Sequence, residues 1–339
     1  MKVEFTSAAN TLVRLRFCKE NLLRKAVVAL GGNALSPPDA VDTIANQFKQ
    51  TRQSLDTIIS LLNRGIIPVI THGNGPQVGN AALRTESLDS VPYLPLGINV
   101  ADTEGGMGYM IEQSLINRLR EEQIDRQVVT LISQVLVRED DPSILNPSKY
   151  IGAKLSESDA QQKVEKFGWT VKQIGEDKWR RVVPSPEPVD IINAEVVKQL
   201  MDLGHIVIAV GGGGVPAFID SDGNLEGLDA VIDKDKASAL LGTQIGAESL
   251  YIFTNVERVA LNYGQPNAQE LSLVTLAEMQ EHMAHGHFPP GDMGPKIEAS
   301  IQFLENGGKE VIITSVECIK RDPSGHGGTV IRHQFDKKL

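Results

Sequence analysis

The stretch AVVALGG, residues 26–32, joins five consecutive apolar residues to a pair of glycines. An apolar run of this length is typical of a strand that is buried on both faces, and the glycines predict a turn directly after it. The same arrangement returns in IIPVITHGNG (66–75) and in IVIAVGGGG (206–214). Its repetition indicates several parallel strands whose glycine turns lie along one edge of a sheet.

Helical segments separate these runs. Apolar residues recur with helical spacing over about residues 38–64, where Gly65 marks the stop, and a second helix is predicted over about 105–119. Further strands are predicted at 128–137, 250–254 and 311–314. Strands that alternate with helices predict an α/β fold of three αβα layers, with a mainly parallel central sheet covered on both faces, and ligands in such folds bind beyond the carboxyl ends of the strands.

The alternation breaks over about residues 139–188, which are polar and close with the proline-rich PSPEP (184–188). Within them, WTVKQIGEDKWRRVV (169–183) predicts a β-hairpin that turns at 175–177. We interpret the segment as a lobe that protrudes from the α/β body, and a surface excursion without function is the alternative. The turn NPSK, which fixes Lys149 near the start of the segment, favours a functional lobe.

These boundaries predict the domain organisation. Residues 1–24 are a basic N-terminal extension of unknown role, and this interpretation is favoured over a processed targeting segment because the apolar core of a secretory signal is missing. Residues 25–335 are expected to form one domain with two halves, 25–204, which carries the lobe, and 205–335.

The composition restricts the partners of the chain. A net charge of −10 at pH 7 argues against nucleic acid and anionic membranes, and it means that an anionic ligand needs a strong local cluster of positive charge. No run of about 18 apolar residues occurs, so no membrane span is predicted. Two cysteines form no disulfide framework, which favours a reducing, cytoplasmic location, with organellar targeting by residues 1–24 as a minor alternative.

The glycine turns are the strongest chemical signal. Glycine lets a ligand approach the backbone closely, and successive N–H groups can converge on an anion, helped by the dipole of a helix that begins there. The known phosphate-binding motifs do not fit: no GxxxxGK[ST] occurs, and GNGPQV (73–78) has valine where a dinucleotide-binding turn needs glycine or alanine. The protein-kinase motifs HRD and DFG are also missing.

Three lysines stand beside turn or glycine chemistry. Lys234 follows an apolar run in AVIDKDKAS (230–238), Lys296 follows Met-Gly-Pro at the start of a predicted helix, and Lys149 lies on the lobe. Each alone is typical of a surface lysine. Together they favour phosphoryl transfer, which asks a protein mainly for positioning and for positive charge on the phosphate oxygens. Within the charged run we expect Asp233 to cap the following helix and Lys236 to be solvated.

Eight motifs in order resemble those of the carbamate kinases, a subfamily with the amino-acid-kinase fold. The residues before Gly31 lack the lysine that acetylglutamate kinases carry there, and Lys149 in the lobe matches its replacement in carbamate kinases. The motifs are ALGGNAL (29–35), THGNGPQVG (71–79), EGGMGYM (104–110), NPSKYIG (146–152), WRRVVPSPEP (179–188), AVGGGGVP (209–216), AVIDKDKAS (230–238) and GDMGPKIEA (291–299).

The resemblance implies a reversible reaction of ATP with carbamate to give ADP and carbamoyl phosphate, with Mg²⁺ held mainly by the nucleotide phosphates and no protein metal ligand assigned. In the family the reaction usually runs toward ATP in arginine or related ureido catabolism, and the enzymes tend to form homodimers. Residues 25–204 would bind carbamate and residues 205–335 the nucleotide. The implied catalytic residues are Lys149, Lys234, Asp235 and Lys296. The implied substrate- and phosphate-binding residues are Gly31, Gly32, Asn33, Gly73, Asn74, Gly75, Gly212 and Gly213. The implied nucleotide-binding residues are Thr254, Asn255, Val256, Met293, Gly294 and Pro295.

Some positions depart from the family pattern. Asn255 replaces the usual aspartate, Ala260 stands where an aromatic residue is common, and Glu104 replaces a glutamine, which leaves details of the nucleotide and substrate pockets open. Two rival functions remain: a kinase of the same fold that acts on an amino-acid carboxylate, and a non-catalytic nucleotide sensor. The histidines of HMAHGH (282–287) lack a carboxylate or cysteine nearby that would complete a metal site.

Overall fold

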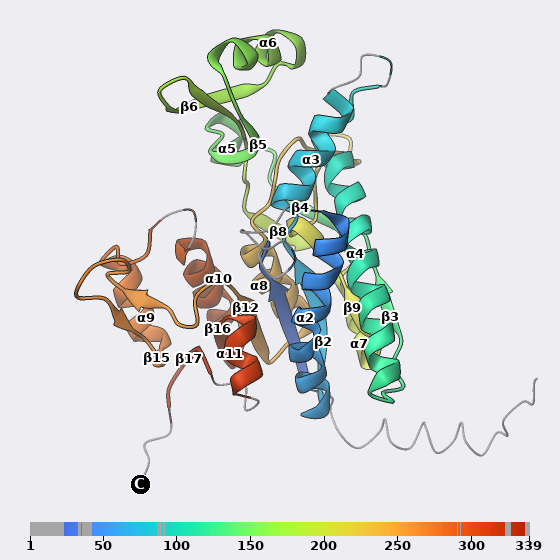
Figure 1. Cartoon of the computed structure of the whole chain (residues 1–339), viewed down its shortest axis with the longest axis vertical. Coiled ribbons are helices and arrows are strands. Elements are labelled where there is room, and N and C mark those ends of the chain that lie inside the picture. The colour runs from blue at the N-terminus through green and yellow to red at the C-terminus, as the bar shows by residue number, and fades with distance from the viewer. Residues whose placement is uncertain are drawn as a thin grey trace, which may run out of the picture.

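The computed structural model describes residues 24–32, 35, 43–86, 90, 92–289, 291, 293–322 and 327–335. The predicted N-terminal extension, except Arg24, lies outside the described residues, and so does the predicted site residue Asn33. Figure 1 shows an α/β body with a smaller lobe standing above it. Among the described helices, none combines the length and the apolar character that crossing a bilayer requires.

The body is built on a mainly parallel sheet, as predicted. In the described part of the chain it has eight strands in the order β15-β17-β16-β12-β1-β2-β9-β3, and the pairing is parallel everywhere except between β16 and β17. The strands are β1 (Arg24–Leu30), β2 (Ile66–His72), β3 (Val128–Thr130), β9 (Ile206–Ile208), β12 (Ser249–Phe253), β15 (Leu273–Thr275), β16 (Glu310–Thr314) and β17 (Thr329–Arg332).

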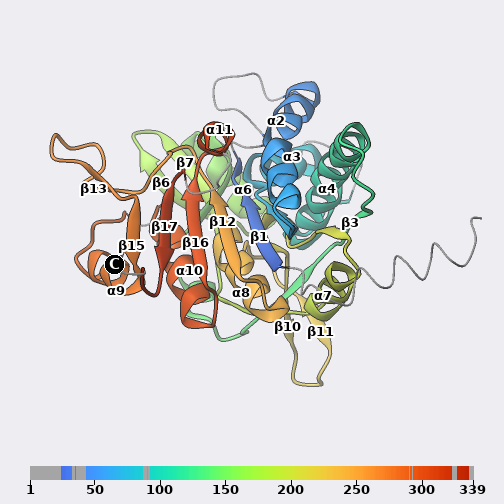
Figure 2. The same cartoon turned by 90° about the horizontal axis from the view of Figure 1, so that it is seen from below.

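Helices cover both faces of this sheet, which confirms the three layers (Figure 2). Because side chains alternate along a strand, Val28 and Leu30 of β1 enter one core while Val27 enters the other. One core contains α2 (Ile44–Asn63), α4 (Leu96–Glu121) and α11 (Val316–Arg321). The other contains α7 (Ala194–Asp202), α8 (Lys234–Ile245), α9 (Leu276–Ala284) and α10 (Met293–Glu305).

Smaller sheets lie outside the main sheet. A second sheet has the order β11-β10-β4-β8, a third in the lobe has the order β5-β7-β6, and β13 pairs with β14. The predicted hairpin is confirmed, because β6 and β7 pair antiparallel on either side of a turn at 176–177. The bounds are β4 (Gln134–Val137), β5 (Lys149–Leu155), β6 (Thr170–Gly175), β7 (Lys178–Val183), β8 (Pro188–Ile191), β10 (Val215–Ile219), β11 (Leu225–Gly227), β13 (Ala260–Leu261), β14 (Gln269–Glu270), α3 (Gly75–Glu86), α5 (Pro142–Leu145) and α6 (Glu157–Phe167).

The prediction of a single strand over 128–137 is wrong. Its first part, β3, pairs with β9 in the main sheet, whereas its last part, β4, pairs with β10 and β8 in the second sheet. The chain bends between them at Ser133, whose hydroxyl accepts a hydrogen bond from the Val210 N–H (2.9 Å) and whose carbonyl accepts one from the Val215 N–H (2.8 Å). An apolar run cannot distinguish one buried strand from two strands in different sheets.

Two helices begin at residues other than those predicted. Helix α2 begins at Ile44, after the N-cap Thr43, and not near residue 38. Helix α4 begins nine residues before the predicted start, at Leu96. The carboxylate of Asp229 accepts the Leu96 N–H at 2.8 Å, so a residue far along the chain satisfies an amide in the first turn. A partner at that distance leaves no signal in the local pattern.

Helix α4 lies directly against the sheet at Gly108. A Cβ atom at this position would lie 2.2 Å from Cγ2 and 3.3 Å from Cβ of Thr130, whose hydroxyl donates to the Glu112 carboxylate at 2.6 Å. Gly106, on the same helix, has open space within 4 Å of the corresponding point. A substitution at Gly108 therefore reports on close packing, whereas one at Gly106 reports on helix propensity.

We predict opposite effects for the two alanine substitutions. Gly108→Ala should lower the free energy of unfolding by about 1–3 kcal/mol because the methyl group overlaps Thr130. Gly106→Ala should raise it by about 0.5–1 kcal/mol because glycine is unfavourable inside a helix. Urea unfolding of both variants measures this difference, and equal changes in stability would contradict the packing of α4 described above.

Candidate active site

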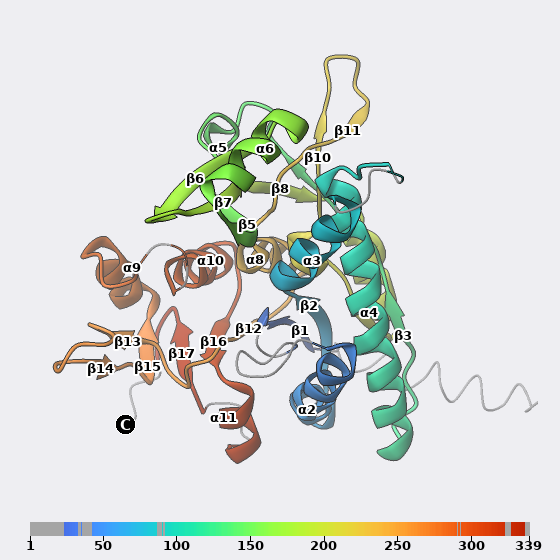
Figure 3. The ribbon, with the colours of Figure 1, turned by 45° about the horizontal axis from the view of Figure 1, so that its top comes forward.

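The glycine turns meet at the carboxyl ends of the central strands, as the sequence predicts. Gly73 follows β2, and a Cβ atom there would lie 3.4 Å from the backbone nitrogen of Gly32, which follows β1. The same point lies 3.2 Å from Cδ of Lys234, at the start of α8. Figure 3 shows α3, α8 and α10 in a row beneath the lobe. One location therefore combines two backbone turns with a lysine.

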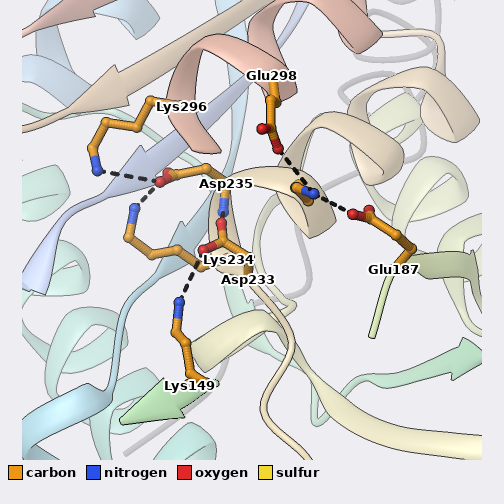
Figure 4. A network of polar contacts seen from close by, with 8 residues as sticks. Lys149, Glu187, Asp233, Lys234, Asp235, Lys296 and Glu298 are labelled. Carbon is orange, nitrogen blue, oxygen red and sulfur yellow. Dashed lines mark hydrogen bonds and ion pairs between the residues drawn. The ribbon is translucent and has the colours of Figure 1, made fainter. Parts of the chain in front are cut away.

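Asp235 holds two of the predicted lysines together (Figure 4). Its side chain is only 4% exposed, and its Oδ1 lies 2.5 Å from Nζ of Lys234 while Oδ2 lies 3.5 Å from Nζ of Lys296. Lys234 belongs to α8 and Lys296 to α10, and the two helices pack together. Because this carboxylate pairs with two ammonium groups from different helices, its geometry suits an organiser of positive charge.

Asp233 links this cluster to the lobe. It is the N-cap of α8, as predicted, and its Oδ1 accepts the Asp235 N–H at 3.0 Å. Its Oδ2 lies 3.0 Å from Nζ of Lys149, the first residue of the lobe strand β5. Burial disfavours its ionisation, but the ammonium groups of Lys149 and Lys234 outweigh burial, so the pKa of Asp233 lies below its usual range.

The expectation that Lys236 is solvated is wrong. Its side chain is 17% exposed and forms ion pairs with Glu187 and, at 3.0 Å, with Glu298. Glu187 belongs to the proline-rich segment PSPEP and Glu298 belongs to α10. Lys236 thus ties the segment at the end of the lobe to the two helices that carry the other lysines.

The remaining phosphate-site residues surround this cluster in different ways. Asn74 is buried and donates from Nδ2 to the Thr103 hydroxyl at 2.9 Å, and a Cβ atom at Gly212 would lie 2.2 Å from the Asn74 Nδ2. The N–H of Gly73 donates to the Leu30 carbonyl (3.0 Å), and that of Gly213 donates to the Val210 carbonyl (3.2 Å). These two amides are therefore already used within the fold.

Positive backbone angles explain why the loop after β9 is made of glycine. Gly212 has φ of 66° and Gly213 has φ of 99°, in the region that side chains disfavour. A Cβ atom at Gly213 would also lie 2.4 Å from the Ile232 carbonyl oxygen. Gly31 is similarly confined, because a Cβ atom there would lie 2.5 Å from the Phe253 carbonyl oxygen. A Cβ atom at Gly32 or Gly75 would have no neighbour within 4 Å.

Four of the six predicted nucleotide residues, Thr254, Asn255, Val256 and Met293, line a separate cavity of about 130 Å³, and Gly294 and Pro295 follow Met293 in the chain. The cavity is lined by Thr254, Asn255, Val256, Arg258, Ala260, Tyr263, His287, Phe288, Pro289 and Met293. Met293 begins α10, Pro295 lies in its first turn, and the Gly294 N–H donates to the Pro289 carbonyl at 3.1 Å. Because Lys296 follows Met293 by three residues, about one helical turn separates the cavity wall from the lysine cluster.

Three residues behind the glycine loops are absent from the predicted site. Thr103 holds Asn74, and Glu104 accepts N–H groups from Gly211 (2.8 Å) and Ser133 (3.1 Å). The only local signal for them was a polar pair within an otherwise small and apolar helical segment, TEGGMG (103–108). His72, the third of these residues, is completely buried beside this loop.

Burial controls the charge of His72. Together with the nearby Lys234 ammonium it lowers the pKa of the imidazole to about 4, against a hydrogen bond to the Gly73 carbonyl that acts in the opposite direction. Its Nδ1 lies 3.3 Å from that carbonyl, which fixes the Nδ1–H tautomer. His72 is therefore neutral at pH 7.

Comparison with known proteins places the chain in a family. The amino acid kinase family matches residues 24–315, and the chain belongs to this family. The matched residues include the lysine cluster and the central sheet apart from β17, while β17 and α11 lie beyond residue 315.

The individual relatives show which members of the family this chain resembles. The carbamate kinase-like protein YahI of Escherichia coli (strain K12) is 44% identical over 310 residues, which cover 90% of this chain and 98% of that protein. Carbamate kinase of Pyrococcus horikoshii is 41% identical over 310 residues, covering 91% and 98%. The structure of carbamate kinase from Giardia lamblia bound to AMP-PNP gives a TM-score of 0.86 at 34% identity and covers 92% of this chain and 99% of that chain. The predicted resemblance to carbamate kinases is confirmed.

We predict that His72 makes folding sensitive to acid. A group whose pKa falls from 6.5 to about 4 on folding contributes stability that is present above pH 6.5 and lost as the pH falls through 4. Between these values wild type should lose about 3 kcal/mol more of its free energy of unfolding than His72→Asn. Urea unfolding at several pH values measures this.

The control for this experiment is His285→Asn, because His285 is exposed near the end of α9. That variant should follow the wild-type curve. If His72→Asn also follows the wild-type curve, the neutral buried state assigned to His72 is wrong.

Proposed function

We propose that the chain is a carbamate kinase that transfers a phosphoryl group directly between ATP and carbamate. The observation that supports this most strongly is the arrangement of Lys149, Lys234 and Lys296 around Asp233 and Asp235 at the carboxyl ends of the strands. Membership of the amino acid kinase family and the named carbamate kinases among the relatives support the phosphotransferase class.

The substrate needs no general base. Carbamate is an anion whose oxygen can attack phosphorus without losing a proton, and His72, the histidine beside the glycine loops, is buried and neutral. The difficulty lies instead in bringing two anions together on a chain of net charge −10. Lysines at the transfer point offset that repulsion, and positioned charge is the main requirement of phosphoryl transfer.

Each lysine has a distinct place in the proposed reaction. Lys234 and Lys296 would bind the phosphates on either side of the bond that breaks, while Asp235 holds their ammonium groups in place. Lys149 would reach from the lobe to carbamate or to the transferred phosphoryl group. Its side chain is 39% exposed, compared with 17% for Lys234 and 12% for Lys296. The lobe lysine is therefore the member of the cluster best able to exchange Asp233 for a ligand.

The backbone turns would complete the anion site. Gly31 and Gly32 follow β1, Gly75 begins α3, and Gly212 belongs to the glycine loop after β9. We propose that these four glycines surround carbamate and the γ-phosphate together with Asn33 and Asn74. Gly73 and Gly213 would contribute chiefly the space that a missing side chain leaves, because their N–H groups serve the fold.

The nucleotide base is proposed to lie in the cavity formed by Thr254, Asn255, Val256 and Met293, with its phosphates directed along the first turn of α10 past Gly294 and Pro295. Ala260 lines the same cavity, so the departures from the family pattern at Asn255 and Ala260 concern the base and leave the lysine cluster intact.

Mg²⁺ would be carried mainly by the phosphates of ATP or ADP. In the described part of the chain no group of three or more histidine, cysteine or acidic residues has the arrangement of a metal site, and both site carboxylates are engaged by lysines. Such a site fits a cation that keeps its water and phosphate ligands, as Mg²⁺ commonly does. When bound, the ion would neutralise part of the phosphate charge.

The physiological setting is also a proposal. We expect the reaction to run toward ATP in arginine or related ureido catabolism, in the cytoplasm, by a homodimer. These expectations rest on the resemblance to carbamate kinases. The two-half organisation, with residues 25–204 for carbamate and 205–335 for the nucleotide, is proposed on the same basis.

The reverse reaction tests the proposal directly. Incubation with ADP, Mg²⁺ and carbamoyl phosphate should yield ATP, measured with a coupled luminescence assay. Forward assays with carbamate, aspartate and N-acetylglutamate in parallel should show phosphorylation of carbamate alone. Turnover of an amino-acid carboxylate would favour the first rival function, and nucleotide binding without any turnover would favour the sensor.

We predict that Lys149→Ala and Lys296→Ala each lose about 10²–10³-fold in kcat while remaining folded, because each removes a positive charge from the transfer point. The matched control is Lys172→Ala, at an exposed position on the lobe strand β6. Steady-state kinetics and circular dichroism of the three variants provide the measurement. A kcat close to that of wild type in either site variant would contradict the role proposed for that lysine.

A further inference from the structure

Glu104 fixes the glycine loop that follows β9. It lies on α4 and is 1% exposed, and its Oε1 accepts both the Gly211 N–H at 2.8 Å and the Ser133 N–H at 3.1 Å. Ser133 in turn accepts the Val210 N–H through its hydroxyl at 2.9 Å. One carboxyl group therefore anchors both the bend after β3 and the first residue of the loop that contains Gly212.

The second oxygen of the same carboxyl group has a different environment. Oε2 of Glu104 is buried without a hydrogen-bond partner in the described structure, and so is Nε2 of His72. Both side chains face Gly211, because a Cβ atom there would lie 2.4 Å from Nε2 of His72 and 2.8 Å from Cγ of Glu104. Since His72 carries its proton on Nδ1, its Nε2 is an acceptor. A proton on Oε2 would supply the donor that this region lacks.

The protonated form is also the one that burial favours. Transfer of an ionised carboxylate into an interior costs several kcal/mol unless a cation or several donors compensate. Burial raises the pKa of Glu104 to about 8, although the N–H groups of Ser133 and Gly211 favour the ionised form. The carboxyl group is thus protonated at neutral pH.

The surroundings contain few groups that could alter this charge. Strands β3, β9 and β10 and the turn η2 (Gly211–Gly213) bring backbone groups and uncharged side chains. The elements around Glu104 carry the following titratable and charged groups: His72 of β2; Lys234, Asp235 and Lys236 of α8; Arg84 and Glu86 of α3; Lys49, Arg52 and Asp56 of α2; and Asp102, Tyr109, Glu112, Arg118, Arg120 and Glu121 of α4 itself. Arg84 and Asp102 line a cavity between α2, α3 and α4, while Asp56 pairs with Arg118 at 3.3 Å. Lys234 is paired with Asp235.

We propose that Glu104 is a positioning residue for the glycine loop at 211–214, that it acts in its protonated form, and that loss of its proton weakens binding of the anionic substrate. The anion is named from the proposed function, while the protonation of Glu104 and its hold on the loop stand independently of it.

The physical reason is the proximity of like charges. An ionised Glu104 would keep its two N–H contacts but would place a negative charge directly behind the loop whose front faces the anion. It would also remove the donor from Oε2, in a region where Nε2 of His72 is buried without a hydrogen-bond partner in the described structure. In a buried site such a charge is poorly screened by solvent. Protonation therefore keeps the loop anchored without opposing the ligand.

Glu104→Gln separates the two protonation states. The amide keeps an acceptor for Gly211 and Ser133 and a donor in place of the Oε2 proton, and it cannot ionise. The control is Glu112→Gln on the same helix, whose carboxylate accepts a hydrogen bond from the Thr130 hydroxyl of β3. We would measure kcat and kcat/KM for carbamoyl phosphate between pH 6.5 and 9.5.

In wild type and in Glu112→Gln, kcat/KM should fall above pH 8 by up to about tenfold per pH unit, while kcat changes little. In Glu104→Gln it should remain constant over the same range. An identical fall in Glu104→Gln would overturn the proposal.

Two further measurements remain decisive if carbamoyl phosphate is not a substrate, and they separate failure of this inference from failure of the proposed function. Between pH 5 and 8 the unfolding equilibrium constant of wild type should rise by up to about tenfold per pH unit relative to that of Glu104→Gln, because stability from a raised pKa is lost as pH rises. Thermal stabilisation by inorganic phosphate should disappear above pH 8 in wild type and persist in the variant. Equal pH dependence in both proteins would contradict the inference.

A spectroscopic measurement on wild type covers the case in which Glu104→Gln does not fold. Infrared difference spectra should show the band of a protonated carboxyl group at pH 6.5, and that band should be lost between pH 7 and 9. If no such band titrates, Glu104 is ionised at neutral pH and the proposal fails.

Discussion

The ion pairs of Asp235 are the constraint on which the candidate site depends. Two lysines from different helices, Lys234 and Lys296, converge on this buried carboxylate, which lies in the first turn of α8. Without it their ammonium groups would repel one another in a region that solvent screens weakly. The position suits a carboxylate because the amino end of a helix carries partial positive charge. A chain with an excess of acidic residues thereby concentrates positive charge at the point where we propose that an anion binds.

The backbone around this cluster follows from the need for close approach. A side chain would overlap a neighbouring carbonyl oxygen at Gly31 and at Gly213, and at Gly73 it would be in tight contact with Lys234. The parallel sheet brings their turns to one edge, and α4 holds two of those turns from behind through Thr103 and Glu104. The lysine cluster and the contacts that hold the glycine turns thus come from different layers of the same fold. The lobe adds a further cation, Lys149.

The sequence predicted the elements whose signal is local. Apolar runs ending in glycine located β1, β2 and β9, and the charged run at Asp233 predicted a helix cap that the structure confirms. The errors arose where a distant partner decides the outcome. The run at 128–137 divides between two sheets, Lys236 is drawn into ion pairs by Glu187 and Glu298, and Glu104 acquires its importance only when Gly211 folds against it. Periodicity and motif spacing contain no information about such contacts.

The most direct test of the account is a crystal structure of the protein with a non-hydrolysable ATP analogue and Mg²⁺. In that structure Nζ of Lys234 and of Lys296 should lie within about 3 Å of phosphate oxygens while Asp235 still contacts both lysines, and the base should occupy the cavity at Thr254 and Met293. Phosphates bound away from these two lysines would contradict it.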